Sequence, residues 1–154
     1  MIYPLNRIPE DKLHLAGGKA RSLSYMLTHT KIKIPEGFVL LPGDTLSASD
    51  IEKLDSRVTY AVRSSAISED GENASFAGQY ETVTDVKVED IPDAVQTVLA
   101  SADNARVKAY ADNSEGVAVV IQRFVKPEFA GVVFTSDINT GKYEEFVGNY
   151  VHGE

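Results

Sequence analysis

The chain lacks cysteine and tryptophan throughout its 154 residues. Without cysteine it can form no disulfide, no thiolate zinc site, no iron–sulfur cluster and no thiol nucleophile. This absence is in keeping with synthesis in a reducing compartment. Hydrophobic residues make up 43% and charged residues 25% of the chain, as in an ordinary globular domain. A domain of this length buries roughly 70% of its unfolded surface, so it needs no metal or disulfide for stability.

Basic residues are outnumbered, with 15 Lys and Arg against 23 Asp and Glu, which gives a net charge of −8. General affinity for a nucleic-acid backbone or an anionic membrane surface needs clustered cations, so the acidic excess argues against both. No apolar run approaches the roughly 20 residues that a membrane-spanning helix requires. We therefore expect a cytoplasmic protein, in which a local cationic pocket for a small anion remains allowed.

Hydrophobic spacing predicts an alternation of helices and strands. Apolar residues at helical spacing predict one helix over 18–28 and another over 90–112, where Asp103-Asn104 is a candidate break. Residues 63–78 contain few large apolar side chains and predict a long loop of the kind that often carries function. The mixture predicts an α+β layered fold. Strands are expected over 38–41, 58–62, 81–86, 116–125, 130–135 and 143–147, and a capping box at 49–52 predicts a short helix.

The first candidate binding element is Gly17-Gly18-Lys19, at the start of the first predicted helix. A helix N-terminus presents unpaired N–H groups and partial positive charge, and glycine lets an anion approach the backbone. The Lys19 ammonium adds a point charge for phosphate. The alternative is a plain helix start with a solvated lysine.

The second candidate is Arg63-Ser64-Ser65, which follows an apolar strand at the start of the long loop. The rigid guanidinium fork of Arg63 suits a pair of phosphate oxygens, and the serine hydroxyls can donate beside it. The alternative is an ion pair between Arg63 and the acidic run 69–72. That run has no defined ligand spacing, so we assign no metal ligand.

Two further segments are candidates for contact with a ligand. Residues 75–79, of sequence Ser-Phe-Ala-Gly-Gln, combine small side chains with one Phe and resemble a flap, in which Gly78 permits close approach of the backbone. Gln122 shares a strand face with Val120, and a buried amide there would need a partner such as an adenine or a ribose. The alternative is that Gln122 faces solvent.

Taken in order, these segments resemble the N-terminal ATP-binding domain of the phosphoenolpyruvate synthase, pyruvate phosphate dikinase and rifampin phosphotransferase family. Each segment alone is a weak signal, whereas five in the family's order are specific. The segments are Gly17-Gly18-Lys19-Ala20 with Leu23, Ile34-Pro35-Glu36-Gly37-Phe38, Val62-Arg63-Ser64-Ser65-Ala66 with Glu69-Asp70, Ser75-Phe76-Ala77-Gly78-Gln79 with Thr82, and Ala130-Gly131-Val132-Val133-Phe134-Thr135 with Asp137 and Thr140-Gly141.

The resemblance implies an ATP-grasp-like fold and a site for ATP with Mg²⁺. It makes Lys19 and Arg63 phosphate ligands, with Arg63 in the catalytic role, and it makes Ser64 and Ser65 supporting donors. It places Gly78 and Thr82 over the phosphates and Gln122 near the nucleotide. In the family, a phosphoryl group of ATP passes to a histidine on a separate domain, which carries it to an acceptor bound by a third domain.

The chain also departs from the family pattern. The region between Phe38 and Arg63 is short, Asp137-Ile138 replaces the family's Asp-Pro, and the acidic metal ligands of the second half and the two further domains are missing. We therefore expect 1–154 to be one partial or minimal ATP-binding domain, inactive by itself but part of a phosphotransferase in a longer chain. The final strand is expected to expose an edge that favours self-association. The alternatives are a non-catalytic interaction module that keeps the fold and an unrelated α+β domain.

Overall fold

The computed structural model describes residues 1–66, 82–109, 116–136 and 146–153, with the side chains of 103–109 left aside. Internal contacts divide the chain into two units, Met1–Phe124 and Val125–Glu154, which are described separately. No helix in the described ranges is long and apolar enough to cross a membrane. The expectation of a single domain over 1–154 stays a prediction.

The first unit is built on a five-stranded antiparallel sheet with strand order β1-β2-β5-β3-β4. β5 lies at the centre, and every residue from Val117 to Gln122 is buried. This strand shows no polar alternation because helices cover both of its faces. The strands are β1 (Ile2–Pro4), β2 (Gly37–Leu40), β3 (Tyr60–Ala66), β4 (Thr82–Val86) and β5 (Val117–Arg123).

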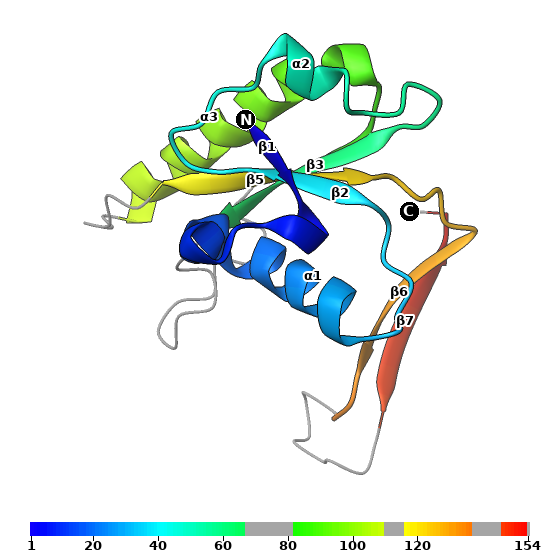
Figure 1. Cartoon of the computed structure of the whole chain (residues 1–154). Helices are drawn as coiled ribbons and strands as arrows, with labels where there is room; N and C mark the ends of the chain where they lie inside the picture. Colours follow the sequence, from blue (N-terminus) through cyan, green and yellow to red (C-terminus); the bar gives the residue numbers. More distant parts are fainter. Residues whose placement is uncertain (67–81, 110–115, 137–145, 154) are drawn as a thin grey trace. The chain divides into compact units, whose positions relative to one another are not determined.

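Helices α1 (Gly17–His29) and α3 (Ile91–Ala109) cover opposite faces of this sheet (Figure 1). Ala16 and Ala20 bring α1 close to the sheet, where they pack with Val39, Leu41 and Val120. On the other face, the predicted stripe of α3 is buried at Ile91, Val95, Val98 and Ala102. The layered α+β prediction is thus confirmed. The remaining helices are α2 (Ala48–Ile51) and the 3-10 helices η1 (Leu5–Arg7), η2 (Glu10–Ala16) and η3 (Val88–Asp90).

Three local predictions were wrong. β3 does not end before Arg63 but continues to Ala66, because β5 pairs with it along its whole length. The capping box uses Ser47 rather than Ser49 as the N-cap, with Asp50 at the third helical position. α3 runs through Asp103-Asn104 without a break, to Ala109.

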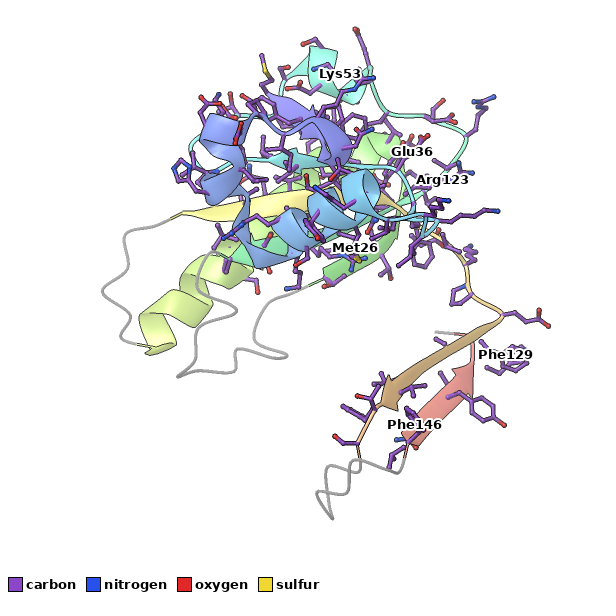
Figure 2. The ribbon with its side chains drawn as sticks, turned by 60° about the horizontal axis from the view of Figure 1, so that its bottom comes forward. Met26, Glu36, Lys53, Arg123, Phe129 and Phe146 are labelled. Atoms are coloured by element: carbon purple, nitrogen blue, oxygen red, sulfur yellow. The ribbon has the colours of Figure 1, made fainter. Side chains whose placement is uncertain are left out.

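The second unit contains an antiparallel hairpin of β6 (Phe129–Phe134) and β7 (Val147–His152). The predicted final strand, 143–147, meets β7 only at its last residue, and 143–145 lie outside the described residues. Both faces carry exposed apolar side chains, and Figure 2 shows Phe129 and Phe146 projecting from this unit. Phe129 makes edge-on ring contacts with Tyr150 and His152 on one face. A two-stranded hairpin alone is marginally stable in water, so these faces need cover.

Candidate functional site

The site starts from the register of β3. Arg63 lies directly opposite Val120 of β5 and opposite Thr82 of β4. Paired residues share a sheet face, and Val120 belongs to the core beneath α1. Arg63 and Thr82 are therefore on the α1 face. Ser65, two residues further along β3 and opposite Ala118, lies on the same face.

The first turn of α1 is fixed against β3 at Ser65. The backbone N–H of Ala20 donates to Ser65 Oγ at 3.0 Å. Gly17 has φ +74°, and a Cβ added there would come within 2.1 Å of the Ser65 carbonyl oxygen. The turn that contains Lys19 is thus held two residues along the strand from Arg63. The structure brings these two predicted ligands to one face of the sheet.

The start of α1 keeps its partial positive charge. Its N-cap, Ala16, has no side-chain cap hydrogen bond, and its first turn contains no acidic residue. Helix N-termini of this kind favour nearby anions by about 0.3–1 kcal/mol each at the surface. Because the turn is docked at Ser65, this favourable potential adds to that of the basic side chains on the same face.

Arg63 is half-buried, and its Nε has no hydrogen-bond partner among the described residues. Burial lowers the pKa of this guanidinium below its ordinary value, although arginine stays charged at neutral pH. A buried donor without an acceptor costs roughly 1–3 kcal/mol, and more for a charged group. The structure thus leaves a buried charged donor without a recorded acceptor in the described ranges.

The other predicted ligands are placed differently. Ser64 pairs with Val119 of the α3-side core, so its buried hydroxyl is on the opposite face from Arg63. Gln122 is on the α1 face, but it is only 5% exposed and its Nε2 donates to the Pro35 carbonyl oxygen at 3.0 Å. The amide therefore already has a protein partner, and the solvent-facing alternative is wrong. Thr82 is exposed, and Gly78 with the rest of 75–79 lies outside the described residues.

Sequence reasoning missed the coupling between α1 and Ser65. The signal was the alternation in Ala61–Ala66: if this segment is a strand, Arg63 and Ser65 share one face and Ser64 takes the other. Because none of these residues is large and apolar, composition alone predicts the start of a loop here.

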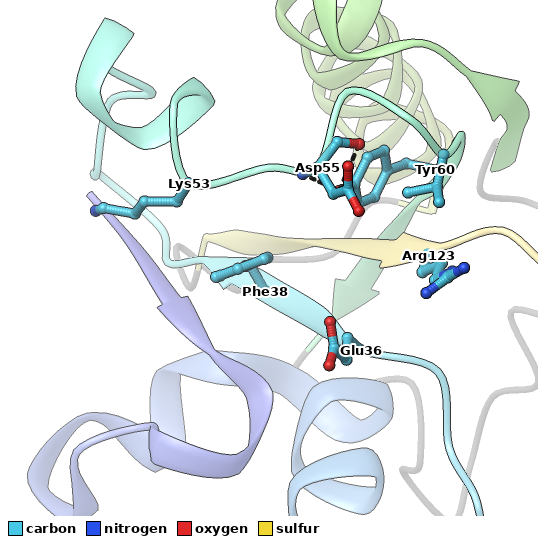
Figure 3. Close-up of a pocket in the computed structure, with 7 residues that line it drawn as sticks. Glu36, Phe38, Lys53, Asp55, Tyr60 and Arg123 are labelled. Carbon is cyan, nitrogen blue, oxygen red and sulfur yellow. Dashed lines mark hydrogen bonds between the residues drawn. The ribbon is translucent and has the colours of Figure 1, made fainter.

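A small pocket of about 70 Å³ lies on the α3 face rather than near Arg63 (Figure 3). The Tyr60 hydroxyl accepts a hydrogen bond from the Asp55 N–H at 2.8 Å. The Asp55 carboxylate pairs with Arg57 through two hydrogen bonds of 2.8 and 2.9 Å, which lower its pKa to about 2. These groups satisfy one another, so we assign this pocket no role. Its lining is Glu36, Phe38, Lys53, Asp55, Val58, Tyr60 and Arg123.

Residues 44–154 match the family model described as pyruvate phosphate dikinase, AMP/ATP-binding domain. The chain belongs to this family. The match confirms the resemblance seen in the sequence. The matched residues include β3 with Arg63, and also β4 and β5.

Several curated proteins are similar to this member of the family. The prodigiosin synthesizing transferase PigC of Serratia marcescens is 33% identical, over 87% of this chain and 20% of its own length. The phosphotransferase YvkC of Bacillus subtilis is 28% identical, over 88% of this chain and 21% of its own length. The phosphoenolpyruvate synthase of Aeropyrum pernix is 40% identical, over 60% of this chain and 12% of its own length.

These relatives are much longer than the matched region, since the chain spans about a fifth or less of each. The alignment with PigC covers 174 residues, more than the 154 of this chain, so PigC carries residues within the aligned region that this chain lacks.

Proposed function

We propose that the α1 face binds the phosphates of ATP and that this domain serves an ATP-dependent phosphotransferase. One observation carries the proposal: Arg63 is held half-buried, with no acceptor for Nε in the part of the chain that the structure describes, beside the first turn of α1, whose N-cap has no side-chain hydrogen bond. A phosphate oxygen would supply that acceptor, and a charge-assisted hydrogen bond of this kind contributes about 1.5–3 kcal/mol.

In this proposal each group contributes by position and charge. Arg63 binds phosphate oxygens and neutralises charge that develops during transfer, which is its catalytic role. Lys19 and the N–H groups of the first turn of α1 add positive potential from the side of the helix. Thr82, directly opposite Arg63 on β4, can donate its exposed hydroxyl to the same phosphates. Ser65 acts indirectly, because its Oγ holds the helix turn in place.

The finer features are also proposals. An ATP-grasp fold would place the nucleotide between this sheet and a second half, with Gly78 closing over the phosphates and Gln122 near the nucleotide. Mg²⁺ would accompany the phosphates; the described residues contain no group of three His, Asp or Glu placed to hold it, so we derive no step through the metal. Transfer to a histidine domain and on to an acceptor domain would occur in a longer chain, in the cytoplasm.

Calorimetry with Mg-ATP on the whole chain tests the proposal. Arg63→Met and Lys19→Ala should each weaken binding by roughly tenfold or more, the equivalent of one charge-assisted contact. Arg21→Ala is the matched control, because Arg21 is exposed on the same helix. Unfolding curves that coincide with those of the unchanged protein would show that the variants fold. Binding unchanged in Arg63→Met, or no binding by the unchanged chain, would contradict the proposal.

The second candidate is an interaction module that keeps the fold without the chemistry. The observation that favours it is the hairpin of the second unit, where Val133 is 70% and Tyr150 is 79% exposed. We propose that this apolar surface mediates self-association. Phosphotransfer by the longer protein would eliminate the non-catalytic alternative, whereas self-association is compatible with either function.

A further inference from the structure

A groove of about 480 Å³ lies on the α3 face, between the segment that follows β2 and the first turns of α3. This volume is within the range of ligand pockets, which is about 300–1,000 Å³. The groove is on the opposite face of the sheet from Arg63, so it is separate from the proposed phosphate site. Its lining consists of Leu40, Asp44, Thr45, Leu46, Pro92, Asp93, Val95, Gln96 and Leu99.

The floor of the groove is aliphatic. Leu40 and Val95 are almost fully buried in the sheet core, and Leu46 and Leu99 pack on them while remaining partly exposed. Such a floor accommodates an aliphatic side chain, because burial there removes apolar surface from water.

The rim carries negative charge. Asp44 and Asp93 are the charged residues of the lining, and neither carboxylate accepts a hydrogen bond or forms an ion pair among the described residues. Two cations are recorded beside the rim: the Met1 ammonium donates to the Thr45 carbonyl oxygen at 2.7 Å, and Lys12, whose pKa is raised by the Tyr3 hydroxyl and also by Asp44, donates to that hydroxyl at 2.7 Å. Neither donates to the Asp44 or Asp93 carboxylate in the described part of the chain, so these carboxylates can accept an external cation.

Two features of the rim argue against an anion. Pro92, at the second position of α3, has no N–H to offer at this helix start, and Asp93 in the first turn already supplies negative charge there. The surrounding protein has a net charge of −8, which also favours cations in solution.

We propose that this groove binds a polypeptide segment of a partner that places a lysine beside an aliphatic side chain. The aliphatic side chain lies on Leu46 and Leu99, and the lysine ammonium pairs with Asp44 and Asp93. Each exposed pair is worth roughly a two- to fivefold change in affinity at low salt, so both carboxylates together favour the lysine by about tenfold.

The test is an NMR titration of the whole chain with acetyl-Leu-Lys-Leu-amide. We expect shifts at the methyl groups of Leu46, Val95 and Leu99, and affinity that falls as salt is raised. Asp44→Asn and Asp93→Asn should each weaken binding two- to fivefold. Asp90→Asn, an exposed aspartate outside the lining, is the matched control and should leave binding unchanged.

A second variant and two comparison peptides keep the proposal falsifiable. Gln96→Lys adds a cation to the rim without removing a carboxylate, so it should weaken the lysine peptide and strengthen the glutamate analogue. The proposal would be overturned if the analogue with norleucine or the analogue with glutamate in place of lysine bound as tightly as the lysine peptide. Equal binding of the norleucine analogue would show that the groove is an apolar patch that does not select for charge. Shifts confined to other residues, or no shifts at all, would overturn it too.

Discussion

Gly17→Ala is the substitution that most directly tests how α1 is anchored on the sheet. Gly17 has φ +74° and ψ 171°, a backbone region that is almost restricted to glycine. An alanine there costs about 1–3 kcal/mol for the backbone alone. Its Cβ would also lie 2.1 Å from the carbonyl oxygen and 2.5 Å from the carbonyl carbon of Ser65. These are backbone atoms of β3, which is paired with β5 at this position, so relief requires α1 to shift, at a further cost of about 1–3 kcal/mol.

Gly43→Ala separates the cost of the backbone conformation from the cost of the close contact with Ser65. Gly43 has φ +80°, but a Cβ added there meets nothing within 4 Å. We expect it to lose about 1–2 kcal/mol, the ordinary cost of a left-handed alanine. Gly17→Ala should therefore lose about 2–6 kcal/mol in total, a large part of the 5–15 kcal/mol typical of a domain.

Urea unfolding of the two variants, followed by circular dichroism, measures both losses. A free energy of unfolding for Gly17→Ala within about 0.5 kcal/mol of that for Gly43→Ala would refute the close approach. Adding Ser65→Ala to Gly17→Ala provides a second check. Because the nearest atoms belong to the Ser65 backbone, removing its hydroxyl should not rescue stability. A rescue would show that the side chain, rather than the strand backbone, blocks the helix.

Three further predictions concern charge and exposed surface. Buried Asp50 accepts hydrogen bonds from Lys53, Ser47 and the Ile2 N–H; burial alone would raise its pKa, but these donors outweigh it and hold the pKa below the ordinary 3.8. The resulting stability should be complete above about pH 4 and lost as pH falls below it, so Asp50→Asn should cost about 2–4 kcal/mol at pH 7 and flatten the acid side of a stability–pH curve. Arg63→Met should leave the free energy of unfolding in urea unchanged or slightly higher, because it removes a buried donor that has no partner among the described residues, while ATP binding weakens roughly tenfold or more. Val132→Lys, on the hairpin face shared with Phe134 and Val151, should reduce concentration-dependent association in sedimentation velocity; unchanged association would exclude that face.

The parts of the fold that follow from local pattern were predictable. The stripe Ile91, Val95, Val98 and Ala102 is buried as its spacing indicates, and α1 begins within one residue of its expected start. These elements have one apolar face each, and spacing alone identifies such a face. β1 escaped notice because three residues are too few for a periodicity, and it exists through its pairing with β2.

The site was harder to predict because it depends on pairing between distant segments. The segment Arg63-Ser64-Ser65 has no strand propensity of note, yet it lies in β3, where it pairs with the remote strand β5 throughout and with β4 at Arg63. Once the segment is a strand, its side chains alternate, and Ser64 must leave the face that Arg63 occupies. Propensity describes single residues, whereas the separation of two adjacent serines onto opposite faces is a property of the sheet.

The Gly17-Gly18-Lys19 motif shows how structural and functional explanations can both hold for neighbouring residues. Gly17 is required by packing, since its missing Cβ lets α1 approach Ser65, and this requirement exists without any ligand. Lys19, partly buried in the same turn, is where the proposed phosphate contact lies. The two explanations predict different losses: Gly17→Ala should lower the free energy of unfolding, whereas Lys19→Ala should lower ATP affinity with little change in stability. If Lys19→Ala instead destabilised the fold as much as Gly17→Ala and bound ATP normally, the whole motif would be explained by helix docking alone.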